Sequence, residues 1–499
     1  MAGERARCCG LNGIGFGGGK WWEFPVHYLG RRCTVRKSKL LPRGLEIGFE
    51  GGLEEEVTAH AGVGLLVETG RRSGVMEKAD RVLPAKKNPK GLGQGQMVES
   101  FVLLSAVGGE CVEDFQTLRA DLGLEAMVGY ELPAPSTARS FLERFHDEEA
   151  LAERPCQGSF IPRESAGLEG LRELVRQSLR AYVSAARPDR VLTMDVDAHL
   201  VESSKREALP TYEGFRGYQP LLVSWAETGL VLADQFRDGN VPPGKGIAEL
   251  VDEAYEGLAA HPEGWVVAVR SDSAAYDVRV LDHWNDRGWK FAVSADMSRQ
   301  LRAEIDKLAP QEWRLWEVEK GGFVREWAEV PYVPSRMGEK KDTRPYRYLA
   351  IRIRSPQGLL FSDGNGVKTF AVVTNDWETE GGALLEWQRG KAGTIEHTHH
   401  ILKDELAAGV YPSGKFGADA AWLRLQVLTH NLLVLMKAVA LDKEYRNARP
   451  KRLRFAIFNH VGRVVRHARD VFIRLHRLLL ERITQPGLER LRLATWPAG

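Results

Sequence analysis

The feature that most constrains the fold is a run of short apolar segments between residues 188 and 310, separated by turns and by two helical patterns. Their composition predicts strands at 191–197, 219–225, 229–236, 265–270 and 290–295. A helix near 246–260 links the third strand to the fourth, and a second helix links the fourth to the fifth. Three strands joined by turns, followed by strands joined through helices, predict an α/β core built on one mixed sheet.

Acidic side chains stand at three points of this pattern. Period-2 alternation along VLTMDVD places Asp195 and Asp197 on one face of the first strand. The apolar strand WVVAVR leads into Asp272, at the strand end where α/β sheets keep their sites. Glu396 opens the helical segment TIEHTHHILKDEL. Three polar residues recur at helical spacing on its face: His399, His400 and Lys403.

Five blocks, taken in order, carry a family resemblance. They are MDVDAH around Asp197, PLLVSWAETGLVLADQFRDGN from Pro220, AVRSDSAAY around Asp272, FAVVTND from Phe370 and RGKAGTIEHTHHILKDEL from Arg389. From residue 55 to about 480 the chain resembles a DDE transposase of a bacterial insertion sequence, from the branch with a β-rich insertion before the catalytic Glu. The resemblance implies an RNase H-like mixed-sheet core interrupted by that insertion.

The resemblance also implies two divalent metal ions, which lie about 3.5–4 Å from each other and are held by carboxylates. The expected ion is Mg²⁺, with Mn²⁺ able to substitute. Asp197 is the expected bridging ligand from the first strand, with Asp195 in reserve, and the sequence leaves open which of them bridges the metals. Asp272 is the expected second ligand and Glu396 the third. These four residues are the predicted catalytic and metal-binding set.

Several other residues are expected to contact DNA. Lys403, two turns after Glu396, is expected to hold a phosphate of the transferred strand, and Arg389 and Lys391 come from the preceding turn. His399 and His400 are expected to support the metal ligands or to contact DNA, because neither HExxH nor zinc-finger spacing is present. Trp327 is a candidate for stacking on an unpaired base, with a buried aromatic as the alternative.

The order of patterns predicts six segments along the chain. They are a Gly-rich leader at 1–54, a helical DNA-binding domain at 55–150, the first part of the core at 188–310, the β-insertion at 311–366, the second part of the core at 367–442, and a basic C-terminal region at 443–499. In the helical domain, the candidate phosphate contacts are Arg71, Arg72, Lys86 and Lys87, with ordinary surface cations as the alternative.

Two further segments carry patterns that could indicate a binding site, one near the C-terminus and one in the leader. Between Arg446 and Arg482, cations greatly outnumber acids, which suits a phosphate backbone, while Leu475, Leu478 and Leu479 also suit an amphipathic packing helix. In the leader, a GxGxxG spacing begins at Gly13, but no strand precedes it and no helix follows. A nucleotide site in the leader is therefore not expected.

Composition sets further limits. The net charge is only +2, so DNA affinity must come from local patches. The five cysteines lack CxxC spacing, which argues against a disulfide framework or a zinc ribbon. No apolar run of about 18 residues and no signal-peptide pattern stand out, so we expect a cytoplasmic, nucleoid-associated bacterial protein without a membrane partner.

The expected function is that of a transposase which binds double-stranded DNA with terminal inverted repeats, cuts it, and joins the ends to target DNA, as a homodimer in the synaptic complex. The alternative is a catalytically defective or domesticated relative that binds DNA without cutting it. A further possibility is an RNase H-like nuclease acting on other DNA structures, against which the block from Arg389 to Lys403 argues.

Overall fold

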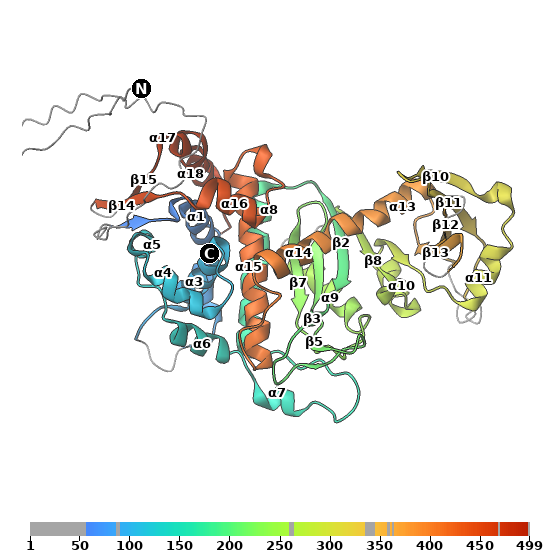
Figure 1. Cartoon of the computed structure of the whole chain (residues 1–499), viewed down its shortest axis with the longest axis horizontal. Coiled ribbons are helices and arrows are strands. Elements are labelled where there is room, and N and C mark those ends of the chain that lie inside the picture. Colours follow the sequence, from blue (N-terminus) through green and yellow to red (C-terminus); the bar gives the residue numbers. More distant parts are fainter. Residues whose placement is uncertain are drawn as a thin grey trace, which may run out of the picture. The chain divides into compact units, whose positions relative to one another are not determined.

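A nine-stranded mixed sheet runs through the described part of the protein (Figure 1). The computed structural model describes residues 56–85, 90–258, 264–334, 345–356, 360–361, 364–467 and 470–497. The strand order is β10-β11-β12-β13-β9-β8-β2-β6-β7. The bounds are β2 Val191–Ala198, β6 Leu221–Trp225, β7 Leu230–Gln235, β8 Val266–Ser271, β9 Lys290–Ser294, β10 Arg314–Val318, β11 Val324–Val330, β12 Arg347–Arg354 and β13 Val367–Thr374.

The centre of the sheet combines two kinds of pairing. Strands β7, β6 and β2 are antiparallel neighbours, whereas β2, β8 and β9 are parallel to one another. Parallel neighbours need a crossover, which helices α9 (Ile247–Gly257) and α10 (Val278–Asp286) provide. The five strands predicted between residues 188 and 310 are all present, and both faces of β2 and β8 are buried, as their apolar runs require.

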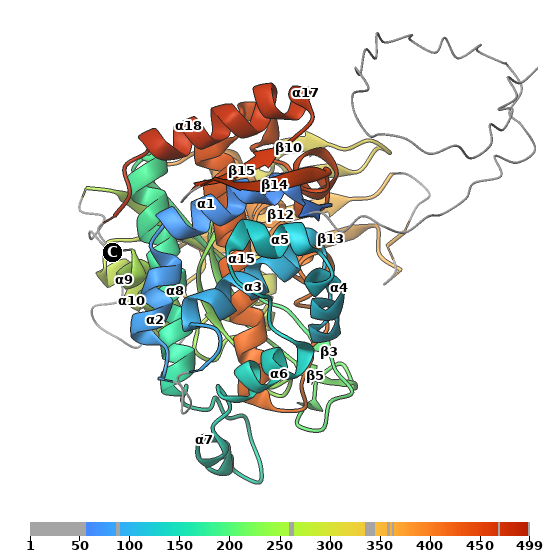
Figure 2. The same cartoon turned by 90° about the vertical axis from the view of Figure 1, so that its left-hand side faces the viewer.

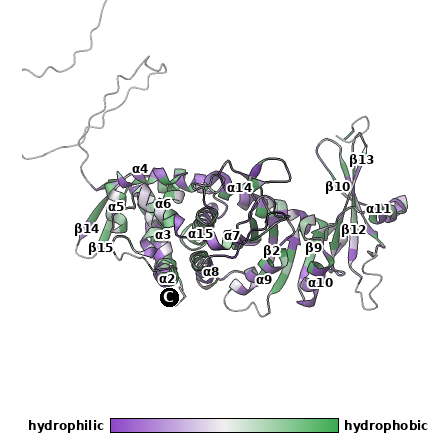
Figure 3. Ribbon diagram, turned by 90° about the horizontal axis from the view of Figure 1, so that it is seen from below, coloured by the Kyte–Doolittle hydropathy of each residue, from purple (hydrophilic) through white to green (hydrophobic). Residues whose placement is uncertain are grey.

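The segment predicted as a β-insertion extends this sheet. β12 pairs with β13 along its whole length, from Arg347 opposite Thr374 to Arg354 opposite Val367, and β10 and β11 continue outward. Only the last three residues of β13, from Val372, pair with β9. Strands β10 to β12 therefore lie at the edge of the sheet opposite to β7 (Figures 1 and 3). Shorter elements complete this region: η3 Ser273–Ala275, α11 Arg299–Asp306 and η4 Pro310–Glu312.

Helix α15 (Phe416–Ala440) covers the other edge of the sheet and packs against β7 and the long helix α8 (Ala166–Ala186). Edge strands leave backbone groups unpaired, and α15 supplies partners for them. The Asn431 side chain accepts a hydrogen bond from the Val231 N–H at 2.9 Å and donates one to the Val231 carbonyl at 2.8 Å. By length and composition α15 could cross a membrane, but 89% of its most apolar window is buried inside the protein, as in a core helix.

Short helices precede α8, as the sequence predicts for residues 55–150. Their bounds are η1 Ala61–Val63, α1 Gly64–Arg72, α2 Val75–Val82, α3 Gln94–Val107, η2 Val112–Asp114, α4 Phe115–Arg119, α5 Leu122–Val128, α6 Pro135–Glu143 and α7 Glu148–Ala152. Several of them, including α1, α3 and α6, pack on α15. Their buried side chains share one continuous hydrophobic core with those of the sheet.

The C-terminal segment forms both a β-hairpin and a helical run, and Leu478 (exposed) and Leu479 (buried) lie in the helical run, as the amphipathic-helix alternative predicts. The bounds are η6 Lys443–Tyr445, α16 Pro450–Leu453, π-helix Arg454–Phe458, β14 Gly462–His467, β15 Asp470–Arg474, and then, without a break, α17 Arg477–Leu479, π-helix Leu480–Thr484 and α18 Gln485–Leu493. β14 also pairs with β1 (Val57–Thr58), beside α5 (Figure 2). Because β1 and β14 lie some 400 residues apart in sequence, no local pattern indicated their pairing.

Three short strands form a separate small sheet after β2. They are β3 Val201–Glu202, β4 Leu209–Pro210 and β5 Arg216–Tyr218, in the order β3-β5-β4. The chain then returns to the main sheet through β6. After β13 it continues through α13 (Gly381–Arg389), η5 (Gly390–Gly393) and α14 (Ile395–Glu405), the elements that carry the rest of the candidate site.

Candidate active site

Asp195 lies at the centre of a buried ion pair. The parallel register places it opposite Arg270 of β8, whose Nε and Nη2 atoms lie 2.6 and 2.8 Å from the two carboxylate oxygens. Neither side chain is more than 6% exposed. The Thr394 hydroxyl also donates to this carboxylate. Both oxygens of Asp195 are therefore held by protein donors, in the bidentate geometry that arginine favours.

Asp197 stands two residues further along β2, on the same face and nearer to solvent. The Lys391 ammonium lies 2.9 Å from its Oδ1 atom, and His399 Nε2 lies 3.4 Å from its Oδ2 atom. The Asp197 side chain is 16% exposed. Its carboxylate is accordingly half-buried, with one cation and one imidazole around it.

His399 contributes a neutral ring to this site. Burial, reinforced by His199 and Lys391, lowers the pKa of His399 to about 3. Its ring centroid lies 5.3 Å from that of His199. The buried Nε2 atom faces Asp197 Oδ2 at 3.4 Å without hydrogen-bond geometry.

Asp272 ends β8 beside Asp197. Val196 and Ser271 are register partners in the parallel pair, so Asp197 and Asp272 are the next residues on two adjacent strands. Asp272 is exposed and caps η3, its Oδ1 atom accepting the Ala274 N–H at 3.1 Å. The two acids therefore stand near the ends of adjacent parallel strands, at the carboxyl edge of the sheet, where open α/β sheets bind ligands.

Glu396 is brought to this edge by α14, which packs against β2 and β6. It lies in the first turn of that helix and is exposed. Within the described ranges, no three His, Cys, Asp or Glu side chains are close enough together to hold a metal ion. The physical reason is visible in the contacts: Asp197 faces Lys391, Asp272 caps a turn, and Glu396 points to solvent.

The predicted polar face of α14 is divided in the structure. His399 is 7% exposed and faces β2, while His400 and Lys403 are exposed. His400 pairs with Asp404 at 2.5 Å, and the Lys403 ammonium lies 3.5 Å from His199 Nε2. The 3.6-residue period explains the division, because i+4 and i+7 stay near the face of Glu396 while i+3 turns toward the sheet.

Two basic residues expected to bind DNA form ion pairs with acidic residues of the protein, Lys391 in a buried position and Arg389 in an exposed one. Lys391 is 7% exposed and its ammonium contacts Asp197, so its role as a free phosphate contact is corrected. Arg389 forms an ion pair with Glu317 of β10 at 2.8 Å, which also raises the pKa of its guanidinium. Their acidic partners, Asp197 and Glu317, lie far away in sequence, so the sequence did not indicate these ion pairs.

The proposed stacking role of Trp327 is wrong, and the alternative of a buried aromatic holds. Trp327 is 2% exposed, and its ring lies so close to Gly381 of α13 that a Cβ at that glycine would overlap it. The Arg314 guanidinium covers the ring at 4.8 Å from its centroid. A base therefore has no access to the ring.

Replacing Trp327 with leucine tests this correction. We expect the free energy of unfolding to fall by about 2 kcal/mol, because a large buried aromatic leaves a partly filled cavity. Urea denaturation measures the change. The affinity for single-stranded DNA should stay the same, and a clear loss of that affinity with unchanged stability would restore the stacking role.

The candidate contacts in the N-terminal helices also have internal partners. Arg71 binds Glu99 through two hydrogen bonds of 2.7 and 2.8 Å, and Arg72 binds Glu68 at 2.6 Å. Lys86, Lys87 and the Gly-rich leader lie outside the described residues.

Sequence reasoning missed Arg270 and Thr394. Arg270 closes an otherwise apolar strand, and a buried arginine needs an acidic partner, which was the available signal. The partner's identity required the parallel register. Thr394 had no comparable signal, because it belongs to a turn between two helices.

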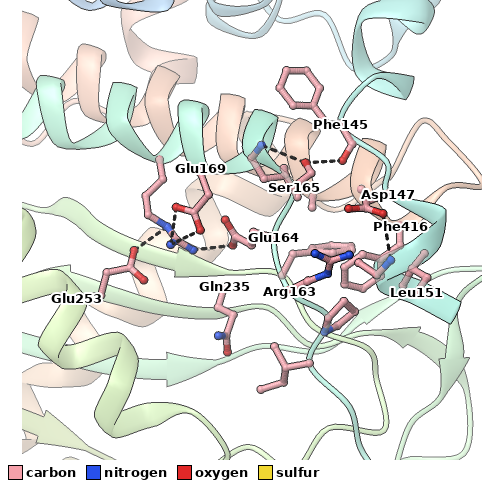
Figure 4. Close-up of a pocket in the computed structure, with 18 residues that line it drawn as sticks. Phe145, Asp147, Leu151, Arg163, Glu164, Ser165, Glu169, Gln235, Glu253 and Phe416 are labelled. Atoms are coloured by element: carbon pink, nitrogen blue, oxygen red, sulfur yellow. Dashed lines mark hydrogen bonds and ion pairs between the residues drawn. The ribbon is translucent and has the colours of Figure 1, made fainter. Parts of the chain in front are cut away.

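A cavity of about 350 Å³ lies on other elements, between the segment around Phe145 and helices α8 and α9 (Figure 4). Its charged groups are already paired: Arg172 lies 2.8 Å from both Glu164 and Glu253. Although burial raises the pKa of Glu164, Arg424 and Arg172 lower it overall. This cavity is consequently a poorer candidate for the site than the edge of the sheet.

Comparisons with known proteins were made for the chain as a whole. No curated protein matches it. Among solved structures, it resembles the piggyBac transposase in a synaptic complex with hairpin DNA, with a TM-score of 0.40 and 10% sequence identity over 79% of each chain. The family model described as transposase DDE domain group 1 matches residues 38–494. Because this match spans most of its length, the chain belongs to the DDE transposase family.

Proposed function

We propose that this protein is an active transposase of a bacterial insertion sequence. It binds the terminal inverted repeats of its element and catalyses metal-dependent strand cleavage and strand transfer into target DNA. The observation that supports the proposal is the position of Asp197 and Asp272 near the ends of two adjacent parallel strands, with α14, which carries Glu396, packed on β2. The order of β7, β6, β2, β8 and β9 supports an RNase H-like core.

The chemistry of the donor set fits divalent metal ions. Asp197, Asp272 and Glu396 offer hard carboxylate oxygens, which Mg²⁺ and Mn²⁺ prefer. We assign Asp197 rather than Asp195 to the metals, because Arg270 and Thr394 already hold both oxygens of Asp195.

The residues of the chain have distinct tasks in this proposal. When bound, the metal ions activate the attacking water or 3′-hydroxyl and stabilise the leaving oxygen of an in-line displacement at phosphorus. Asp197 and Asp272 are fixed by the sheet, so they set the position of the reacting phosphate. Glu396 joins them from α14. Arg270 and Thr394 position β2 and the turn before α14 relative to each other.

A groove near the end of α14 is the proposed DNA-backbone surface, and we call it the basic groove. Its cationic residues are Arg449, Lys451 and Arg452, and its volume is about 720 Å³. Phe455, 77% exposed, also lines it. Arg449 contacts Glu405, the last residue of α14, so the groove continues from the helix that carries Glu396 and Lys403. Glu405 and Glu444 also line the groove and Arg449 is paired with Glu405, so Lys451 and Arg452 are the proposed phosphate contacts.

Lys403→Ala tests the path between groove and site. We expect end binding to weaken several-fold, and the slope of binding against salt concentration to fall by about one charge, because one phosphate contact is lost. Fluorescence anisotropy with cut repeat ends at several salt concentrations measures both. Lys320→Ala, in the turn between β10 and β11, is the control. Unchanged end binding and strand joining in Lys403→Ala would remove the role.

The second candidate function is that of a relative that binds DNA without cutting it. The observation that favours it is the engagement of Asp197 by Lys391, which leaves this carboxylate paired in the described state. We propose the catalytic function because all three acids are present and lie at one edge of the fold. A homodimer in the synaptic complex and a cytoplasmic, nucleoid-associated location belong to the same proposal.

The deciding experiment is strand cleavage by the purified protein on DNA that carries the sequences flanking its own gene. Mg²⁺, Mn²⁺ and EDTA are compared, alongside the Asp272→Asn variant. Cuts at the repeat ends that require both metal and Asp272 are the expected result. Binding to those ends without cuts would favour the non-catalytic function.

A further inference from the structure

Lys391 lies on a short turn, and its charged side chain is buried. Its ammonium is 2.9 Å from Asp197 Oδ1, and the residue is only 7% exposed. Lysines this buried are rare unless they are paired, because an unpaired ammonium loses its hydration. Asp197 is therefore the counter-charge that allows Lys391 to be buried, and Lys391 is equally the counter-charge of Asp197.

The turn that carries Lys391 is tied to the sheet at several points. It is η5, Gly390–Gly393, between α13 and α14. On one side Arg270 donates to the Trp387 carbonyl, and on the other the Thr394 hydroxyl donates to Asp195. At Gly393 a Cβ would meet open space, so packing does not require a glycine there. The Gly393 end of the turn is therefore open, whereas the Gly390 end is packed against Arg270, whose Nη1 atom would lie 2.9 Å from a Cβ at Gly390.

We propose that Lys391 is an internal counter-cation that must leave Asp197 before a divalent cation can bind there. This inference rests on the proposed function, because it takes Asp197 as a metal ligand. An ammonium and a divalent cation on one partly buried carboxylate repel each other, because little water screens the two charges. A divalent cation that binds Asp197 then replaces the Lys391 ammonium there. The turn that carries Lys391 loses its contact with Asp197 as a result.

The exchange has a structural consequence for the third acid. Lys391 and Glu396 are five residues apart, with Thr394 between them at the start of α14. When Lys391 leaves Asp197, the turn is held by fewer contacts, and the first turn of α14 gains freedom. Glu396, which points to solvent in the described state, can then approach the other two acids.

The test measures Mn²⁺ binding to the full chain by electron paramagnetic resonance of free Mn²⁺, without DNA and without an activity readout. Lys391→Gln keeps a hydrogen-bond donor and removes the charge, and we expect it to bind Mn²⁺ about tenfold more tightly than the wild type. Lys391→Arg keeps the charge and should bind like the wild type. Lys290→Gln, which removes a lysine paired with Asp376 at 3.4 Å, is the matched control and should also behave like the wild type.

Hydrogen–deuterium exchange gives a second readout, which works even if Lys391→Gln folds poorly. In the wild type, Mn²⁺ should speed exchange of the amides of η5, Gly390–Gly393, because it displaces Lys391. In Lys391→Gln this exchange should be fast already and change little with Mn²⁺. Exchange in the wild type that is slowed or unaltered by saturating Mn²⁺ would overturn the inference.

The outcomes separate this inference from the proposed function. Saturable Mn²⁺ binding that is lost in Asp197→Asn but equal in the wild type and Lys391→Gln would overturn the role of Lys391 and leave the metal site in place. No saturable binding in either protein would overturn both. Tighter binding in Lys391→Gln, abolished by adding Asp197→Asn, is the result we expect.

Discussion

Replacing Glu396 with glutamine is expected to reduce strand cleavage by about 10²- to 10³-fold or more, while binding to the repeat ends stays within about twofold. Glutamine has nearly the same shape as glutamate but lacks the charge that a metal ligand needs. The side chain is exposed in the first turn of α14, so its replacement should leave the folded structure unchanged. Cleavage on labelled repeat ends and anisotropy on the same DNA give the two quantities.

Glu386→Gln is the matched control for this prediction. Glu386 is also an exposed acid, on the neighbouring helix α13. Its replacement with glutamine changes the net charge by the same amount as Glu396→Gln. We expect this control to cut normally. A Glu396→Gln protein that cleaves as well as the control would remove Glu396 from the catalytic set, and a parallel loss in both would point to a general charge effect on DNA binding.

Replacing Arg270 with methionine should lower the free energy of unfolding by about 3–5 kcal/mol, because it leaves the buried Asp195 carboxylate without its counter-charge. Asp195 is 0% exposed, so water cannot replace the two hydrogen bonds from the guanidinium. The Arg270 contact with the Trp387 carbonyl is lost as well, which loosens the turn before α14. Guanidinium denaturation followed by circular dichroism measures the loss.

A double-mutant cycle distinguishes this ion pair from simple packing. Asp195→Leu combined with Arg270→Met removes both charges, and we expect the double variant to be more stable than Arg270→Met alone. Adding the effects of the two single variants should therefore overestimate the loss. Strictly additive losses would show that the two side chains stabilise the fold independently, contrary to the observed bidentate contact.

Much of the sheet could be predicted from the sequence because its signals are local. Apolar β-branched runs bounded by turn residues located β2, β6, β7, β8 and β9, and period-2 alternation placed Asp195 and Asp197 on one face. The pairing of β14 with β1 joins segments about 400 residues apart, so no local pattern indicated it.

The candidate site shows the same division. The sequence by itself determined which carboxylates stand at strand ends and at the start of a helix, since the spacing of acids along each element is a local property. Only the tertiary structure decided which carboxylate is available: the parallel register put Arg270 opposite Asp195, and the turn before α14 placed Lys391 on Asp197. It likewise buried Trp327 under α13. Charge pairing and burial depend on which residues meet in space, and that information lies in the packing of elements rather than in any one of them.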